Sequence, residues 1–361
     1  MNNNRNIKVM LAMSGGLDSS TAAILLLEQG YQITGITFRP YDSISKACME
    51  KETGCCNADT LFEARRLADT LGFEHRIIDV RQVFKDTIIR NFIDEYMSGR
   101  TPNPCVLCNN IIKWGILLEE AMQADCEYIA TGHYARIGVD GKRHFLRRGV
   151  DLTKDQSYFL WMLTDEVLRK TMFPLGDLTK KAVREIARSH GFTHIADKRE
   201  SQEVCFIPDN DYRRFIRENV NQLPGAGNFI DSNGKILGKH QGYPFYTIGQ
   251  RKGLQIALGE PAYVTAIIPE TNTVVLGKTE DLHCPKAQLN NVLLNKPVNS
   301  GDTIMVKIRY KTPAIPAVIL QHGDNWFVEF KAEARAVTPG QSAVFYENDD
   351  IIGGGVISKI S

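Results

Sequence analysis

Apolar runs alternate with amphipathic segments over the first half of the chain. The stretches IKVMLAM (7–13), YQITGITF (31–38) and EHRIIDV (74–80) are typical of buried strands. The spacing of apolar residues predicts helices at 19–29, 58–73, 82–97 and 109–123, and a further strand at 127–138. Strands that alternate with helices predict an α/β fold with a parallel sheet, which binds ligands beyond the carboxyl ends of its strands.

The pattern changes in the second half. After Pro208, the clusters LPGAG, SNGK, GYPF and GQRKG leave no room for long helices and predict a small central domain. From about Cys284 onward, TIMVKIRY, AIPAVILQ, NWFVEF and QSAVFY alternate apolar and polar residues between turns, which predicts a compact β-barrel or sandwich. We therefore expect a catalytic domain at 1–210, a linking domain at 211–284 and a β-barrel domain at 285–361.

Composition narrows the class of protein only slightly. The 361 residues are 43% hydrophobic and 24% charged, which is ordinary for a soluble globular protein. Since 43 Lys and Arg face 42 Asp and Glu, any surface for nucleic acid must be a local basic patch. The N-terminal MNNNRNIKVM lacks a secretory apolar region, and no run approaches the roughly 18 apolar residues of a membrane helix. We expect a cytoplasmic protein with no membrane partner.

Eight cysteines in a cytosolic chain are better explained by metal binding or redox catalysis than by static disulfides. This draws attention to Cys105, Cys108 and Cys205. A single cytosolic cysteine is more often a small buried apolar residue, and Cys126 and Cys284 are interpreted in that way. Cys48, Cys55 and Cys56 follow the second predicted strand and receive no role.

The segment LAMSGGLDSS (11–20) joins the first strand to the first helix through two glycines. Glycine lets consecutive backbone N–H groups point toward phosphate oxygens, and the following helix adds its positive N-terminus. The spacing of a Walker loop is absent, since no lysine follows the glycines. Asp18 is suited to hold Mg²⁺ on the phosphates, because Mg²⁺ prefers carboxylate and phosphate oxygens. The segment also fits a simple capped helix start.

The SGG-x-DS loop resembles that of the PP-loop ATP pyrophosphatases, which cleave ATP between its α and β phosphates and adenylate a carbonyl oxygen. Further stretches extend the likeness from residue 7 nearly to the end of the chain: GRTPNPCVLCNNIIKW (99–114), ATGHYAR (130–136), KDQSYFL (154–160), SQEVCFI (201–207), GYPFYTIGQRKGL (242–254) and RY (309–310). Together they resemble the tRNA-specific 2-thiouridylase family, which replaces the 2-oxygen of the wobble uridine with sulfur.

The resemblance implies two catalytic thiols. Cys205 matches the cysteine that receives a persulfide, and Cys108 matches the one that resolves the disulfide-linked intermediate. Such thiols need a depressed pKa and an electropositive, partly open setting, and Lys198 and Arg199 lie close to Cys205 in sequence.

The resemblance also assigns two sets of binding residues. Contacts to ATP are implied for Ala12, Met13, Ser14, Gly15, Gly16, Leu17, Asp18, Ser19, Phe38 and Gly132. Contacts to tRNA or its target base are implied for Asn103, Pro104, Cys105, His133, Lys154, Asp155, Gln156, Arg309, Tyr310 and Gln341. Because tRNA is held mainly through its phosphates, further contacts are expected from Lys142, Arg143, Arg147, Arg148, Arg213, Arg214, Arg217, Arg251 and Lys252. By residue type alone, each of these cations is also consistent with an ordinary solvated side chain.

Cys105 departs from the family pattern, in which an aspartate precedes the C-N pair by three positions. Cys105 and Cys108 form a C-x-x-C pair, and with Cys205 they would supply three thiols. Three thiols are the usual protein set for a [4Fe–4S] cluster with one open iron, or three of the four ligands of a zinc site. An iron–sulfur-dependent tRNA thiolase is therefore an alternative to transfer by two thiols, with Cys105 otherwise a tolerated replacement.

Other functions would use only part of the sequence. An amide-forming PP-loop synthetase would explain the loop and leave Cys108 and Cys205 idle, and a non-enzymatic tRNA-binding scaffold would need no ATP turnover. For the thiouridylase, the resemblance implies as partners the anticodon stem-loop of tRNAs of the Lys, Glu and Gln type and a persulfide donor, either a cysteine desulfurase or a sulfur-relay carrier. The wobble base would have to leave the anticodon stack to reach the pocket.

Overall fold

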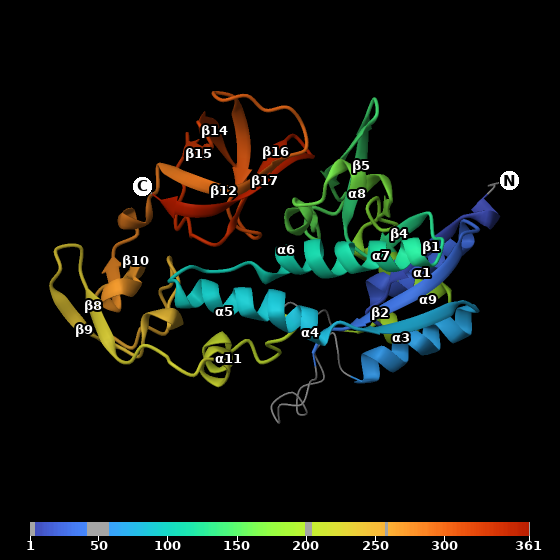
Figure 1. Ribbon diagram of the computed structural model, residues 1–361, viewed down its shortest axis with the longest axis horizontal. Coiled ribbons are helices and arrows are strands. Elements are labelled where there is room, and N and C mark those ends of the chain that lie inside the picture. Colours follow the sequence, from blue (N-terminus) through green and yellow to red (C-terminus); the bar gives the residue numbers. More distant parts are fainter. Residues whose placement is uncertain (1–3, 42–57, 199–203, 257–258, 361) are drawn as a thin grey trace. The chain divides into compact units, whose positions relative to one another are not determined.

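The computed structural model describes residues 4–41, 58–198, 204–256 and 259–360 (Figure 1). The chain forms two compact units. Unit 1 comprises residues 1–88, 105–210 and 349–351, and unit 2 comprises residues 89–104, 211–348 and 352–361.

The helices follow the predicted segments with local interruptions. The α-helices are α1 (Leu17–Glu28), α3 (Ala58–Leu71), α4 (Arg81–Phe84), α5 (Arg90–Met97), α6 (Pro104–Cys108), α7 (Leu117–Gln123), α8 (Asp165–Arg169), α9 (Lys180–Ser189), α10 (Thr193–Ala196) and α11 (Tyr212–Asn219). The π-helical turns are η2 (Lys85–Ile89) and η3 (Asn109–Ile116), and the 3-10 turns are η1 (Asn4–Asn6), η4 (Ser157–Leu160), η5 (Tyr243–Phe245), η6 (Pro269–Thr271) and η7 (Glu280–Leu282).

The strands form three sheets. Unit 1 contains β1 (Lys8–Ala12), β2 (Gln32–Arg39), β3 (Glu74–Asp79), β4 (Tyr128–Thr131), β5 (Ala135–Asp140), β6 (Arg143–Arg148) and β7 (Thr171–Met172). The strands of unit 2 are β8 (Gly227–Ile230), β9 (Ile236–His240), β10 (Tyr263–Ile268), β11 (Thr273–Gly277), β12 (Lys286–Leu294), β13 (Thr303–Lys307), β14 (Ile315–His322), β15 (Asn325–Phe330), β16 (Ser342–Glu347) and most of β17 (Asp350–Ile360).

The parallel sheet predicted for the first half is confirmed, with the strand order β3-β2-β1-β4-β7. Ala12 at the end of β1 pairs with Ile36 of β2 on one side and Thr131 of β4 on the other. Apolar side chains of α1, α3, α9 and α10 pack with Val9 and Leu11 on one face of the sheet. Figure 1 shows α1 and α9 side by side. The chain order reverses between β1 and β4, and an open α/β sheet binds its ligands at such a switch point.

The strand predicted at 127–138 is wrong as a single element. It is split at residues 132–134, because β4 joins the parallel sheet whereas β5 pairs antiparallel with β6. The helices predicted at 82–97 and 109–123 each contain a π-helical turn, η2 and η3. Apolar periodicity does not distinguish a π turn from an α turn, and π turns are frequent at functional sites.

The central segment of unit 2 forms the small domain predicted there, with α11 followed by a sheet of order β10-β11-β8-β9. The aromatic side chains of Phe229, His240 and Tyr246 pack edge to face, with ring centroids 5.1–5.3 Å apart. Buried aromatic packing therefore replaces long helices as the core of this domain.

The C-terminal strands close into a six-stranded antiparallel barrel, so the barrel expectation holds rather than the sandwich. The order is β12-β15-β14-β13-β16-β17, and β12 also pairs with β17, with Leu294 opposite Gly353. The segment 350–360 becomes the closing strand, although it has three consecutive glycines and was not predicted as a strand. A Cβ on Gly353 would lie 2.4 Å from the Leu293 carbonyl oxygen, so the close approach of these strands requires glycine.

Among the described residues, no helix is both long enough and apolar enough to span a membrane.

Candidate active site

The predicted nucleotide loop leaves the carboxyl end of β1 at the switch point of the sheet. Gly15 has φ +68°, a left-handed conformation that glycine adopts without strain. Inside the loop, the Ser14 N–H donates to Ser19 Oγ at 3.1 Å, and the Ser19 hydroxyl donates to the Gly16 carbonyl at 3.2 Å. Gly16 caps α1 and has no side chain to accept from the first turn, so the N–H groups of that turn can bind an anion.

Gly132 touches this loop from the end of β4. A Cβ at position 132 would lie 2.8 Å from the carbonyl carbon of Asp18 and 2.8 Å from the backbone nitrogen of Ser19. These are backbone atoms that cannot rotate away. The structure therefore brings Gly132, predicted from a motif more than 100 residues away, against the predicted ATP loop. Phe38, also predicted to contact ATP, lies near the carboxyl end of β2 and is partly exposed.

Asp18 is bound by two residues that were not predicted from the sequence. The Lys180 ammonium donates to Asp18 Oδ1 at 2.7 Å and to Oδ2 at 2.9 Å, and the Tyr134 hydroxyl donates to Oδ1 at 2.8 Å. Lys180 is the first residue of α9 and Tyr134 follows the ATGH motif. Nothing in the sequence distinguishes Lys180 from its neighbour Lys181, since both begin the same amphipathic helix.

The site fits Mg²⁺ through Asp18. A carboxylate beside a phosphate-binding loop is the ligand type that Mg²⁺ prefers. Both Asp18 oxygens already hold the Lys180 ammonium. A divalent ion and the ammonium would therefore share one carboxylate.

Cys108 is the last residue of α6 and directly precedes the π-helical turn η3, which contacts the end of β4. The Lys113 ammonium lies 3.5 Å from His133 Nε2, and the Trp114 and His133 ring centroids are 5.4 Å apart. His133 directly follows Gly132, which touches the loop at Asp18 and Ser19. The helix of the first predicted thiol is thus connected to the predicted ATP loop through one histidine.

His133 is held in its neutral form. Burial, together with the Lys113 charge, holds its pKa well below the ordinary value. Because lysine only donates, Nε2 accepts from Lys113, and the proton on Nδ1 is donated to Thr131 Oγ1 at 2.8 Å. His133 is therefore a fixed hydrogen-bonding group that does not carry charge near neutral pH.

Cys205 is partly exposed and lies beside the chain that follows β2. The Tyr41 hydroxyl donates to the Cys205 carbonyl, and the Phe206 ring packs edge to face on Phe84 with centroids 5.7 Å apart. These contacts tether the second predicted thiol to residues just beyond β2 and β3, at the carboxyl edge of the sheet. Lys198, which lies close to Cys205 in sequence, pairs with Glu63. Arg199 lies outside the described residues.

The three-thiol cluster is not supported. In the described ranges, no group of three Cys, His, Asp or Glu residues is arranged to hold a metal ion, so Cys105, Cys108 and Cys205 do not form a cluster site. Cys105 is exposed on α6. The C-x-x-C spacing indicates a metal site only where the fold brings further ligands together, and here it does not.

The remaining cysteines carry less information. Cys284 is buried in the barrel core, as interpreted from the sequence. Cys126 is only half-buried, and burial raises the pKa of its thiol. Cys48, Cys55 and Cys56 lie outside the described residues.

The KDQ motif, predicted to contact tRNA, also has a structural role. The buried Asp155 carboxylate accepts from the backbone N–H groups of Gly149 and Ser157 at 3.1 Å each. Gln156 accepts from the Tyr134 N–H at 3.0 Å. Lys154 is partly exposed. Gln156 thus holds the backbone of Tyr134, and Asp155 fixes the backbone at Gly149 and Ser157.

Unit 2 holds the other residues predicted to contact tRNA. The Arg309 guanidinium donates to the carbonyl oxygens of Ile248 and Ala336 at 2.9 Å each. The Gln341 amide donates to the carbonyls of Thr101 and Pro102 at 3.0 Å each. These two side chains tie together segments of unit 2. Three further residues predicted to contact tRNA are partly exposed or buried there: Tyr310, Asn103 and Pro104.

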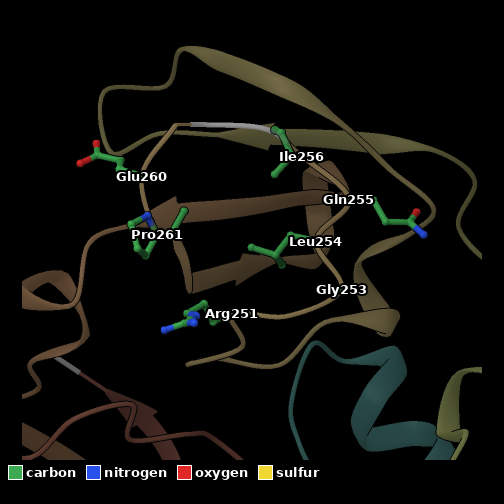
Figure 2. Close-up of a pocket in the computed structure, with 8 residues that line it drawn as sticks. Arg251, Gly253, Leu254, Gln255, Ile256, Glu260 and Pro261 are labelled. Atoms are coloured by element: carbon green, nitrogen blue, oxygen red, sulfur yellow. The ribbon is translucent and has the colours of Figure 1, made fainter.

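The Lys and Arg side chains expected to contact tRNA differ in their interactions with other residues of the protein. Four make ion pairs or stack on aromatic rings: Arg147 with Asp350, Arg214 with Glu218, Arg213 over Tyr246 and Arg217 over Phe245. Arg148 is partly exposed, and Lys142, Arg143, Arg251 and Lys252 are exposed. Arg251 also lines a hollow of about 370 Å³ together with Gly253, Leu254, Gln255, Ile256, Glu260, Pro261 and Ala262 (Figure 2).

Three family models together match nearly the whole chain. They are described as a tRNA methyl transferase HUP domain at residues 7–209, a tRNA methyl transferase PRC-barrel domain at 213–278, and an aminomethyltransferase beta-barrel domain at 286–357. The tRNA-specific 2-thiouridylase MnmA of Amoebophilus asiaticus is 50% identical over 97% of this chain and 95% of its own. The chain belongs to the tRNA-specific 2-thiouridylase family. The three-part fold predicted from the sequence is confirmed.

Other 2-thiouridylases match to a similar extent. The protein of Cytophaga hutchinsonii is 46% identical over 98% of this chain and 97% of its own, and that of Carboxydothermus hydrogenoformans is 47% identical over 98% of each. Among solved structures, a 4-thiouridine synthetase–RNA complex with bound ATP is 18% identical, covers 58% of this chain and 50% of its own, and has a TM-score of 0.36.

Proposed function

We propose that this 2-thiouridylase converts the wobble uridine of tRNA into 2-thiouridine, using ATP and a cysteine persulfide. The observation that carries the proposal is that the π-helical turn directly after Cys108 contacts the strand end beside the nucleotide loop. Lys113 of this turn meets His133, and Gly132, the residue before His133, touches Asp18 and Ser19. An activating loop and a thiol-bearing helix at one edge of a sheet suit a reaction in which an oxygen is activated and sulfur replaces it.

The chemistry proceeds in balanced steps. The uracil 2-oxygen attacks the α-phosphorus of ATP, and the bond to the bridging oxygen breaks to release pyrophosphate. The terminal sulfur of a Cys205 persulfide then bonds to carbon 2. The Cys108 thiolate attacks the Cys205 sulfur, the persulfide S–S bond breaks, and AMP leaves with the carbon–oxygen bond electrons. The products are 2-thiouridine, AMP, pyrophosphate and a Cys108–Cys205 disulfide that a thiol reductant reopens.

The binding residues follow the predicted sets. The loop residues 12–19 with Phe38 and Gly132 would bind ATP, and Asp18 would hold Mg²⁺, which screens the phosphate charge when bound. His133 and the segment 103–105 would approach the base. Exposed cations such as Lys142 and Lys252 would contact phosphates of the anticodon stem-loop. We place the reaction in the cytoplasm, with three domains at 1–210, 211–284 and 285–361 and a cysteine desulfurase or relay carrier as donor.

Cysteine variants test this function. The purified protein is incubated with unmodified tRNA, ATP and a persulfide donor, and both pyrophosphate and the nucleosides of digested tRNA are measured. Cys205→Ala should abolish 2-thiouridine but retain tRNA-dependent pyrophosphate release, because activation precedes sulfur transfer. Cys126→Ala is the matched control and should behave as the unsubstituted protein. Full thiolation by Cys205→Ala would exclude the persulfide role.

The same assay separates other functions. An amide-forming synthetase would show no dependence on Cys108 or Cys205. A scaffold would release no pyrophosphate. The methyl transferase in the family models' descriptions would give a methylated nucleoside in place of a sulfur-containing one.

A further inference from the structure

Lys180 is an unusually constrained cation for a residue outside every predicted motif. Its side chain is only 11% exposed, and its ammonium bonds both oxygens of Asp18 and lies 5.4 Å from the centroid of the Tyr134 ring. Its backbone is fixed as well. Thr179 caps α9, and the Lys180 N–H donates to Asp151 Oδ2 at 3.0 Å.

The negative charge of Asp18 lies where a phosphate would bind, so it must be neutralised by a cation. Asp18 lies in the first turn of α1, where the helix N-terminus attracts anions. A carboxylate at that place would repel a polyphosphate. The Lys180 charge cancels the Asp18 charge and leaves the backbone N–H groups of the loop as the net attraction.

Lys180 also contacts residues that border the switch point of the sheet. Its ring partner Tyr134 follows Gly132 by two residues, and Gly132 touches the loop at the switch point between β1 and β4. A ligand in the crevice at that point meets the loop amides and the Asp18–Lys180 pair together.

We propose that Lys180 contacts the β-phosphate of ATP and the pyrophosphate formed from it. In the ligand-free protein its ammonium rests on Asp18. When a polyphosphate binds, the ammonium shares its donors between Asp18 and the β-phosphate oxygens, since it has three donors and two of its bonds are already to one carboxylate. This inference rests on the proposed ATP-binding role of the loop, which it deepens by assigning the cation for the leaving group.

The test compares ligands with and without a β-phosphate. Binding of ATP, inorganic pyrophosphate and AMP is measured by titration calorimetry without added divalent metal. Lys180→Met should weaken ATP and pyrophosphate binding by about 10- to 100-fold, the range for losing one charge-assisted hydrogen bond. AMP binding should stay within about twofold, because AMP lacks the group that Lys180 contacts. Lys181→Met is the matched control, since Lys181 is the next residue of α9 and its side chain is 86% exposed.

A second pair of variants covers the case in which Lys180→Met leaves Asp18 uncompensated and unfolds. Asp18→Asn removes the carboxylate, and Lys180→Met is then added to it. The double variant should bind pyrophosphate about tenfold more weakly than Asp18→Asn alone. Equal losses for ATP, pyrophosphate and AMP would mean that Lys180 only shapes the loop, and unchanged pyrophosphate binding in both backgrounds would also overturn the proposal. If the unsubstituted protein binds none of the three ligands, the titrations are repeated with Mg²⁺, and absence of binding there as well means that the proposed ATP-binding function fails instead.

Discussion

Replacing Gly132 with alanine would place a methyl group against the backbone of the nucleotide loop. The new carbon would lie 2.8 Å from Asp18 C, 2.8 Å from Ser19 N and 3.0 Å from Asp18 O. Ordinary contacts begin near 3.4 Å, so β4 and the loop must separate by about 0.6 Å in a close-packed interior.

The size of the effect follows from this displacement. Overpacking of this kind costs about 1–3 kcal/mol, and the lower entropy of the unfolded alanine chain offsets about 0.4–1 kcal/mol of it. A loop N–H that moves by about 0.6 Å stretches a hydrogen bond to phosphate from about 2.9 Å beyond its useful range. We therefore expect a net destabilisation of about 1–2 kcal/mol and ATP binding at least about tenfold weaker.

Urea unfolding and calorimetric titration with ATP measure the two effects. Gly225→Ala is the control, because no atom lies within 4 Å of the added carbon and Gly225 is exposed. The reasoning is refuted if Gly132→Ala binds ATP as tightly as the unsubstituted protein and unfolds at the same urea concentration.

Three further outcomes follow from side-chain contacts. The pKa of His133 is lower in the folded than in the unfolded protein, so the unfolded chain binds more protons below the ordinary histidine pKa, and the free energy of unfolding should fall as pH drops through about 6.5. His133→Gln should flatten this pH dependence in urea titrations at several pH values. An unchanged slope would contradict the assignment. Gln341→Ala removes two bonds to backbone carbonyls and should lower the free energy of unfolding by about 1–3 kcal/mol in denaturant titrations, whereas no loss would show that water replaces the amide. Lys252→Glu should weaken tRNA binding and reduce its dependence on salt by about one counterion, and a slope equal to that of the unsubstituted protein would remove Lys252 from the interface.

Local pattern was a good guide wherever one face of an element is buried. The first three strands and the helices around them follow from apolar spacing, and the barrel strands from strict alternation. The predicted strands were wrong where pairing with distant strands, rather than local sequence, sets the strand bounds. The segment 127–138 is apolar enough for one strand, but it divides between two sheets at residues 132–134. The glycine-rich segment 350–360 forms a strand by pairing with β12, and Gly353 lets the neighbouring backbone approach closely.

The sequence by itself determined the alternation of strands and helices, the glycine loop and the separated motifs that identify the family, because each depends on residue types at short spacing. Only the tertiary structure decided that Lys180 and Tyr134 hold Asp18, and that η3, the turn after Cys108, meets His133 through Lys113. It also decided that three cysteines do not make a metal site among the described residues. The contacts of Asp18 and of His133 join residues that are far apart along the chain. They depend on how the sheet orders its strands, which no local spacing encodes.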